Sequence, residues 1–166
     1  MSNSEPVNAY LAPKISENSI YVIETVNRET TGKIWDKLSE LGPKLSFQAS
    51  TIQKLIRLSF SNFNRLTQNQ IYPDDKSLLP DVKDMYATIW DDSTKNEKKK
   101  RWAKIKTKTV DDGPPDGPDL TILSTTAKLA QDGIVELLTF DHDFILFAEE
   151  IFGQFGVSVK NGWLLK

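Results

Sequence analysis

Residues 118–159, PDLTILSTTAKLAQDGIVELLTFDHDFILFAEEIFGQFGVSV, decide the predicted fold. Asp119 stands where a helix N-cap belongs, and an apolar helical face follows it as far as Gly133. The run IVELLTF (134–140) has the length and continuous apolar character of a strand covered on both faces. FILFAEEIF then predicts a helix, punctuated by glycines, and Val157–Val159 a short last strand. This alternation is typical of an α/β fold with a parallel sheet.

The first half of the chain adds one strand and two helices. SIYVIETV predicts a buried strand over Ile20–Ile23. A helix is expected over residues 29–41, stopped by Gly42-Pro43, and a second one over residues 50–66. The expected apolar faces consist of Ile34, Trp35, Leu38 and Leu41 on the first helix and of Ile52, Leu55, Ile56 and Phe60 on the second.

The middle of the chain is less regular. Residues 69–79 are rich in turn formers, and Asp81 is a candidate cap for a helix through VKDMYATIWDD. Its expected apolar face consists of Val82, Met85, Tyr86 and Ile89.

Together these elements predict a three-layer α/β/α sandwich with a mostly parallel central sheet. The strands 20–23, 134–139 and 157–159 are expected to lie parallel in that one sheet. At 166 residues the chain has the size of one domain, predicted over residues 19–166. Residues 1–18 predict a flexible tail, and a basic helix or loop is expected as an insertion around residues 91–118.

Composition excludes several classes of function. The sequence has no cysteine, which excludes disulfides, thiolate metal sites and a cysteine nucleophile. A single histidine, His142, excludes histidine-rich zinc sites. No apolar run approaches the ~20 residues of a membrane span, and the N-terminus has no signal-peptide pattern. We expect a soluble cytoplasmic protein without a membrane partner.

Charge is distributed unevenly along the chain. Residues 111–166 carry ten acidic and three basic side chains, whereas Lys95–Lys108 carries eight basic side chains and one acidic one. Such a basic block is commonly a solvated face. The functional alternative is an arm that contacts RNA phosphates, with Trp90 and Trp102 available for base stacking. The candidate nucleic-acid-binding residues are Lys98, Lys99, Lys100, Arg101, Trp102 and Lys104.

Carboxylates follow the predicted strands where parallel sheets bind ligands. Glu24 ends the first strand, Asp119 opens a helix, and Asp141 and Asp143 follow the second strand. Grouped carboxylates favour a bound Mg²⁺ or Mn²⁺, which prefers oxygen ligands and activates water against a phosphodiester. Each residue also has a structural alternative. Asp119 could be only an N-cap, Asp141 and Asp143 a turn with a cap, and Glu24 a partner of Arg28.

Residues 118–159 resemble the C-terminal half of PIN-domain ribonucleases. Thr139, Asp141, Asp143 and Phe144 match the family's Thr-x-Asp-x-Asp-Phe motif in order, after an aspartate that opens a helix. The resemblance implies a divalent-metal-dependent endoribonuclease with three or four acids at the rim of a parallel sheet. It also leaves a homodimer or another protein partner open.

The N-terminal half departs from the family's pattern. Glu24-Thr25 stands where members have Asp-Thr or Asp-Ser, and Gln53 stands where they have a glutamate. Two hypotheses follow: a nuclease whose metal is held by Asp119, Asp141, Asp143 and Glu24, or a catalytically impaired module that binds nucleic acid or a protein. An unrelated α/β interaction protein and a phosphatase-like site remain further alternatives.

Overall fold

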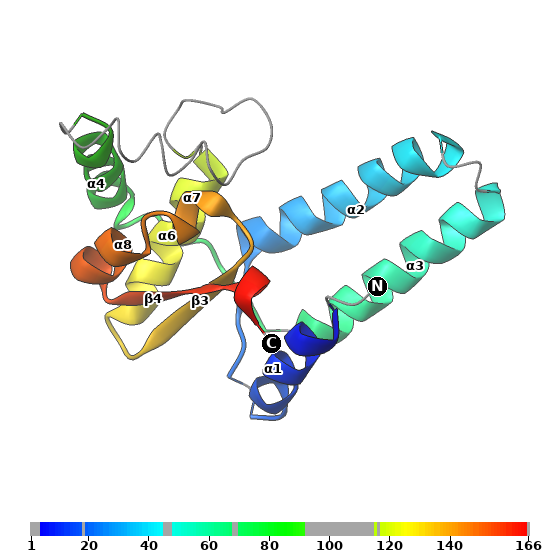
Figure 1. Ribbon diagram of the computed structural model, residues 1–166, viewed down its shortest axis with the longest axis horizontal. Helices are drawn as coiled ribbons and strands as arrows, with labels where there is room; N and C mark the ends of the chain where they lie inside the picture. Colours follow the sequence, from blue (N-terminus) through cyan, green and yellow to red (C-terminus); the bar gives the residue numbers. More distant parts are fainter. Residues whose placement is uncertain are drawn as a thin grey trace. The chain divides into compact units, whose positions relative to one another are not determined.

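The computed structural model describes residues 4–17, 19–44, 48–67, 70–91, 115 and 117–165 (Figure 1). Their fold is mixed α/β and mostly helical, with short parallel strands in two small sheets. Contacts divide the chain into two compact units. One runs from Ala9 to Asp74, and the other takes in the described residues from Asp75 onward together with residues 4–8. The mixed α/β class is therefore confirmed, and a single central sheet between two helical layers stays a prediction.

Residues 4–16, within the segment expected to be a flexible tail, form helix α1 (Ser4–Ser16). The flexibility of this segment stays a prediction. Pro6 lies in the first turn, where the N–H that proline lacks would have no helical partner. At the other end the Ser16 hydroxyl donates to the Pro13 carbonyl at 2.7 Å. Pro13 lies inside the helix, whereas Pro6 lies in its first turn.

Helices α2 (Glu24–Lys44) and α3 (Ala49–Thr67) lie side by side as an antiparallel hairpin (Figure 1). α2 begins earlier than predicted and runs through Gly42 and Pro43, so the expectation that these residues stop it is wrong. Gly42 is buried, and a Cβ atom there would collide with the side chain of Ile52 on α3. The glycine therefore lets the two helices approach each other closely.

The apolar face predicted for α3 is confirmed where its side chains are described. Ile56 is buried, and Ile52 and Leu55 are half-buried. On α2, Leu38 is half-buried, but Trp35 is 57% exposed, and its assignment to the covered face is wrong. One neighbouring helix covers only a narrow strip, and an indole is too large to be enclosed by it. The remaining predicted side chains lie outside the described residues: Ile34, Leu41 and Phe60.

A small parallel sheet pairs β1 (Val22–Ile23) with β2 (Ile71–Tyr72) in the same unit. β1 lacks Ile20 and Tyr21 of the predicted strand, because pairing with β2 covers only Val22 and Ile23. β2 lies in the segment expected to consist of turns. Two strand residues before a proline are too few to produce a recognisable alternation.

Asp74, just after β2, anchors the first turn of α2. Its carboxylate accepts the Thr25 N–H at 2.9 Å and the Thr25 hydroxyl at 2.7 Å. The Arg28 guanidinium lies 3.8 Å from the same carboxylate. A carboxylate that accepts a first-turn N–H does the work of an N-cap, here from 49 residues away in the sequence.

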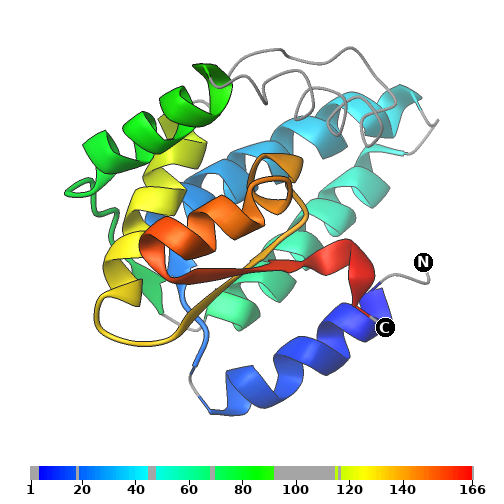
Figure 2. The ribbon, with the colours of Figure 1, turned by 60° about the vertical axis from the view of Figure 1, so that its left-hand side comes forward.

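In the unit from Asp75 onward, β3 (Val135–Thr139) and β4 (Val157–Asn161) pair in parallel over their whole length (Figure 2). Both strands were predicted and are confirmed. The expectation that the first is covered on both faces is wrong: Glu136 is exposed, Ile134 precedes the strand and is fully exposed, and Phe140 after it is 43% exposed. Two strands form too narrow a sheet to bury the ends of such a run.

Four helices pack in the part of this unit from Asp75 onward that the structure describes. Helix α6 contacts both strands and α4, while α8 lies along β4 (Figure 2). The helix predicted over residues 144–152 is two helices, because the chain turns at Leu146–Phe147. Gly156 ends the second with φ 69° and donates its N–H to the Phe152 carbonyl, whereas Gly153 lies inside the helix. The four are α4 (Leu79–Asp91), α6 (Gly117–Ala130), α7 (His142–Ile145) and α8 (Ala148–Phe155).

Helix α6 is enclosed on all sides over Thr121–Ala127. Its buried hydroxyls are hydrogen-bonded: Thr125 and Thr126 donate to carbonyls four residues earlier, and Ser124 donates to the Asp75 carbonyl at 2.8 Å. The Asp75 N–H in turn donates to Thr125 Oγ1 at 2.9 Å. These bonds fix α6 to the segment that precedes α4.

Helix α4 buries the predicted face, Val82, Met85, Tyr86 and Ile89, and this prediction is confirmed. Asp81 was expected to precede the helix as its cap. The helix begins at Leu79, so Asp81 lies in its first turn instead. A negative charge is favourable there as well, because it faces the positive end of the helix dipole.

Candidate functional site

The end of β3 carries the Thr-x-Asp-x-Asp motif into α7. Thr139 Oγ1 accepts the Asp141 N–H at 2.9 Å, and Asp141 Oδ1 accepts the Asp143 N–H at 2.9 Å. The Asp141 carbonyl also accepts the Ile145 N–H. Asp141 is therefore the N-cap of α7, as the structural alternative to a metal-binding role predicted. It is exposed, and a carboxylate with one hydrogen-bonded oxygen keeps further lone pairs for a ligand.

Asp143 lies inside α7 and is half-buried, with its Oδ1 atom shielded from solvent. Its main-chain carbonyl accepts a hydrogen bond from the Tyr86 hydroxyl of α4 at 3.2 Å. The contact joins residues 57 apart in the sequence. It places the second aspartate of the motif beside a buried phenol.

Asp119 occupies the first turn of α6 and is half-buried. The helix begins at Gly117, so the expectation that Asp119 is its N-cap is wrong. A carboxylate in the first turn still gains from the helix dipole.

The charges of these acids act on the Tyr86 hydroxyl. Burial raises its pKa well above the ordinary value, and the negative charges of Asp143, Asp119, Asp141 and Glu150 raise the pKa further. Glu150, in the first turn of α8, was not predicted, because its distance to the motif depends on how α7 and α8 turn.

The described side chains do not form a three-ligand metal site. Among them, no three histidines, aspartates or glutamates are placed to hold one ion. Mg²⁺ usually keeps several waters when it binds to protein, so it does not need a full set of protein ligands. The convergence of Asp119, Asp141 and Asp143 on a single metal stays a prediction.

Glu24 and Gln53 belong to the unit Ala9–Asp74, and both are exposed. Glu24 is the first residue of α2. The structural alternative was that Glu24 pairs with Arg28. The Arg28 guanidinium instead donates to Thr25 Oγ1 at 2.9 Å and lies 3.8 Å from the Asp74 carboxylate. The placement of Glu24 beside the three aspartates stays a prediction.

The predicted nucleic-acid contacts lie outside the described residues, as do most of the expected insertion and the side chain of Trp90. These contacts are Lys98, Lys99, Lys100, Arg101, Trp102 and Lys104.

No family model, curated protein or solved structure matches this chain. In the part of the chain that the structure describes, no helix combines the length and the apolar character needed to cross a membrane.

Proposed function

We propose that the chain is a PIN-like nuclease that hydrolyses RNA phosphodiester bonds with a carboxylate-held Mg²⁺ or Mn²⁺. One observation carries the proposal: Asp141 and Asp143 directly follow the carboxyl end of β3, where the buried Tyr86 hydroxyl donates to the Asp143 carbonyl at 3.2 Å. The negative charges of Asp119 and Glu150 act on the same hydroxyl. Ligands of parallel α/β sheets bind at this end. Like charges gathered in one place are stabilised by a cation.

In this proposal Asp119, Asp141 and Asp143 hold the cation. The bound ion supplies a water of lowered pKa and neutralises charge on the phosphate. Asp141 contributes the carboxylate oxygen that does not cap α7. The positive charges of the lysine-rich segment Lys98–Lys104 bind the RNA backbone.

A second candidate is a catalytically impaired module that binds nucleic acid or a protein partner. Two features favour it: Gln53 offers a neutral amide where the family has a carboxylate, and Asp141 Oδ1 is engaged in capping α7. Fewer charged ligands weaken a divalent-ion site.

Calorimetric titration with Mn²⁺, followed by cleavage of a labelled RNA, separates the two functions. The nuclease binds Mn²⁺ and cleaves, and Asp119→Asn keeps the fold but loses both activities. Asp132→Asn is the matched control, because Asp132 is an exposed aspartate in the turn after the same helix. Loss of folding in Asp119→Asn, or cleavage at the wild-type rate, contradicts the assignment of Asp119. A wild-type protein that binds RNA, does not bind Mn²⁺ and does not cleave the RNA supports the impaired module.

A further inference from the structure

Tyr86 connects a helix with no predicted role to the acidic motif. It projects from α4, is 1% exposed, and donates its hydroxyl hydrogen to the main-chain carbonyl of Asp143. The bond reaches the backbone of α7 at the second aspartate of the motif. Because the acceptor is the main-chain carbonyl, this hydrogen bond fixes the position of the helix backbone and does not involve the Asp143 carboxylate.

Helix α7 depends on such contacts for its position. It spans four residues, His142–Ile145, and a helix of one turn is not stable by itself. Apart from the Asp141 cap, it is held by burial of Phe144 and of Phe147 just after it, at 3% and 1% exposure. Asp141 at its start and Asp143 within it move wherever α7 moves.

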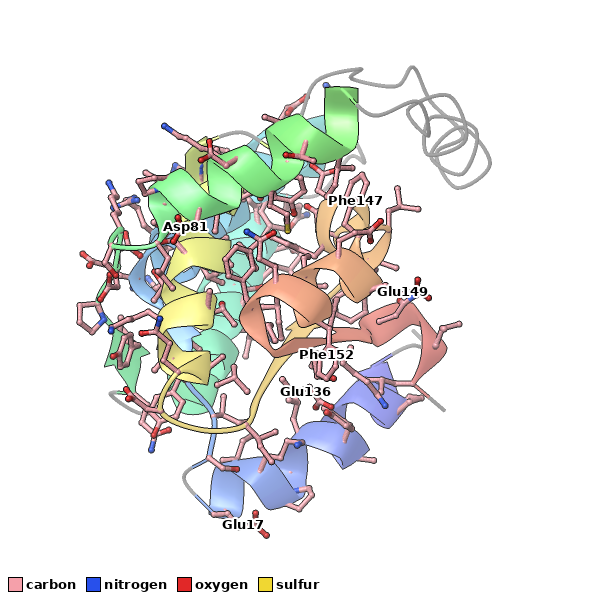
Figure 3. All side chains as sticks on the ribbon, turned by 90° about the vertical axis from the view of Figure 1, so that its left-hand side faces the viewer. Glu17, Asp81, Glu136, Phe147, Glu149 and Phe152 are labelled. Atoms are coloured by element: carbon pink, nitrogen blue, oxygen red, sulfur yellow. The ribbon has the colours of Figure 1, made fainter. Side chains whose placement is uncertain are left out.

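Tyr86 makes the aromatic contact to this segment as well as the polar one. Its ring meets the Phe147 ring edge to face, with 5.6 Å between centroids and an interplanar angle of 86°. Phe147 lies between α4 and the start of α8 (Figure 3). The ring contact positions the phenol, and the hydroxyl adds a directed bond.

We propose that Tyr86 is a positioning residue: its hydroxyl holds α7 so that Asp141 and Asp143 stand where they bind the cation. This inference rests on the proposed function.

The test is Tyr86→Phe, which removes one oxygen atom and keeps the ring against Phe147. Groups that orient metal ligands typically change metal affinity 10–100-fold when removed. We expect Tyr86→Phe to weaken Mn²⁺ binding about 10-fold in calorimetry. Cleavage at low Mn²⁺ falls with the affinity, and saturating Mn²⁺ restores most of the rate. Amide hydrogen exchange at Asp143 and Ile145 becomes faster in the metal-free variant, because α7 has lost a restraint.

Tyr72→Phe is the matched control, since it removes a phenol oxygen from the unit Ala9–Asp74 and leaves Mn²⁺ affinity unchanged. If Tyr86→Phe binds Mn²⁺ as tightly as the wild type, the positioning role is overturned and the proposed function stands. If its rate stays low at saturating Mn²⁺, the role is likewise overturned. If the wild type itself binds no Mn²⁺, the proposed function and this inference fail together.

Discussion

The hydroxyl of Thr125 is the most informative group to remove from the core. Thr125 Oγ1 accepts the Asp75 N–H at 2.9 Å and donates to the Thr121 carbonyl at 2.9 Å. Thr125→Val keeps the branched shape and leaves the Asp75 N–H without this acceptor. Because α6 carries Asp119, the bond also ties the candidate site to the start of the unit.

The expected cost follows from the partner that is left behind. A buried donor without an acceptor costs about 1–3 kcal/mol. Asp75 is half-buried, so water compensates in part and the expected loss is about 1–2 kcal/mol. Thr126→Val is the matched control in the next position. It removes only a donor to the Ile122 carbonyl, which keeps its bond within the helix, and the expected change is within about 0.5 kcal/mol.

Urea denaturation followed by circular dichroism measures both variants against the wild type, with similar slopes expected for all three. In thermal melts, about 1–2 kcal/mol corresponds to roughly 2–8 °C for a chain of this size. Equal losses for Thr125→Val and Thr126→Val would refute the reasoning, since they would mean that the Asp75 bond has no special value.

Three further predictions concern other parts of the chain. Gly32→Ala should stabilise α2 by about 0.5–1 kcal/mol, because alanine favours a helix over glycine and the new Cβ meets no neighbouring side chain. Gly42→Ala should destabilise α2, because its Cβ collides with Ile52. Urea midpoints measure both changes. The raised pKa of Tyr86 contributes stability that is fully present below the unfolded value of about 10 and is lost as the pH rises above it. Between about pH 8 and 11, the free energy of unfolding measured in urea should therefore decrease less steeply with pH for Tyr86→Phe than for the wild type. The same pH dependence in both proteins would contradict this expectation. Charge reversal of Lys98–Arg101 should weaken RNA binding and flatten its salt dependence over about 50–200 mM, and an unchanged salt slope would mean a solvated face.

Local patterns determined several elements of this fold. Val82, Met85, Tyr86 and Ile89 recur at helical spacing, and burying that stripe is the strongest force on α4. The same rule holds for Ile52, Leu55 and Ile56 on α3. The apolar strand that ends at Thr139 and the short strand after Gly156 were also predictable. So was the role of Asp141 as a helix cap. These features depend on residues within one or two turns of each other.

The tertiary structure alone decided the rest. Asp74 caps α2 from 49 residues away, Asp75 bonds α6 across 50, and Tyr86 reaches Asp143 across 57. Neither end of such a bond has a local signature, because any buried polar group needs a partner but its sequence position does not say which one. The sequence named three of the four acids whose charges act on the Tyr86 hydroxyl, but only the packing of α4 shows that this hydroxyl bonds to the Asp143 carbonyl and that Glu150 acts on it too. Hydrophobic burial is encoded by spacing along the chain, whereas the pairing of polar groups is settled by the folded distances between them.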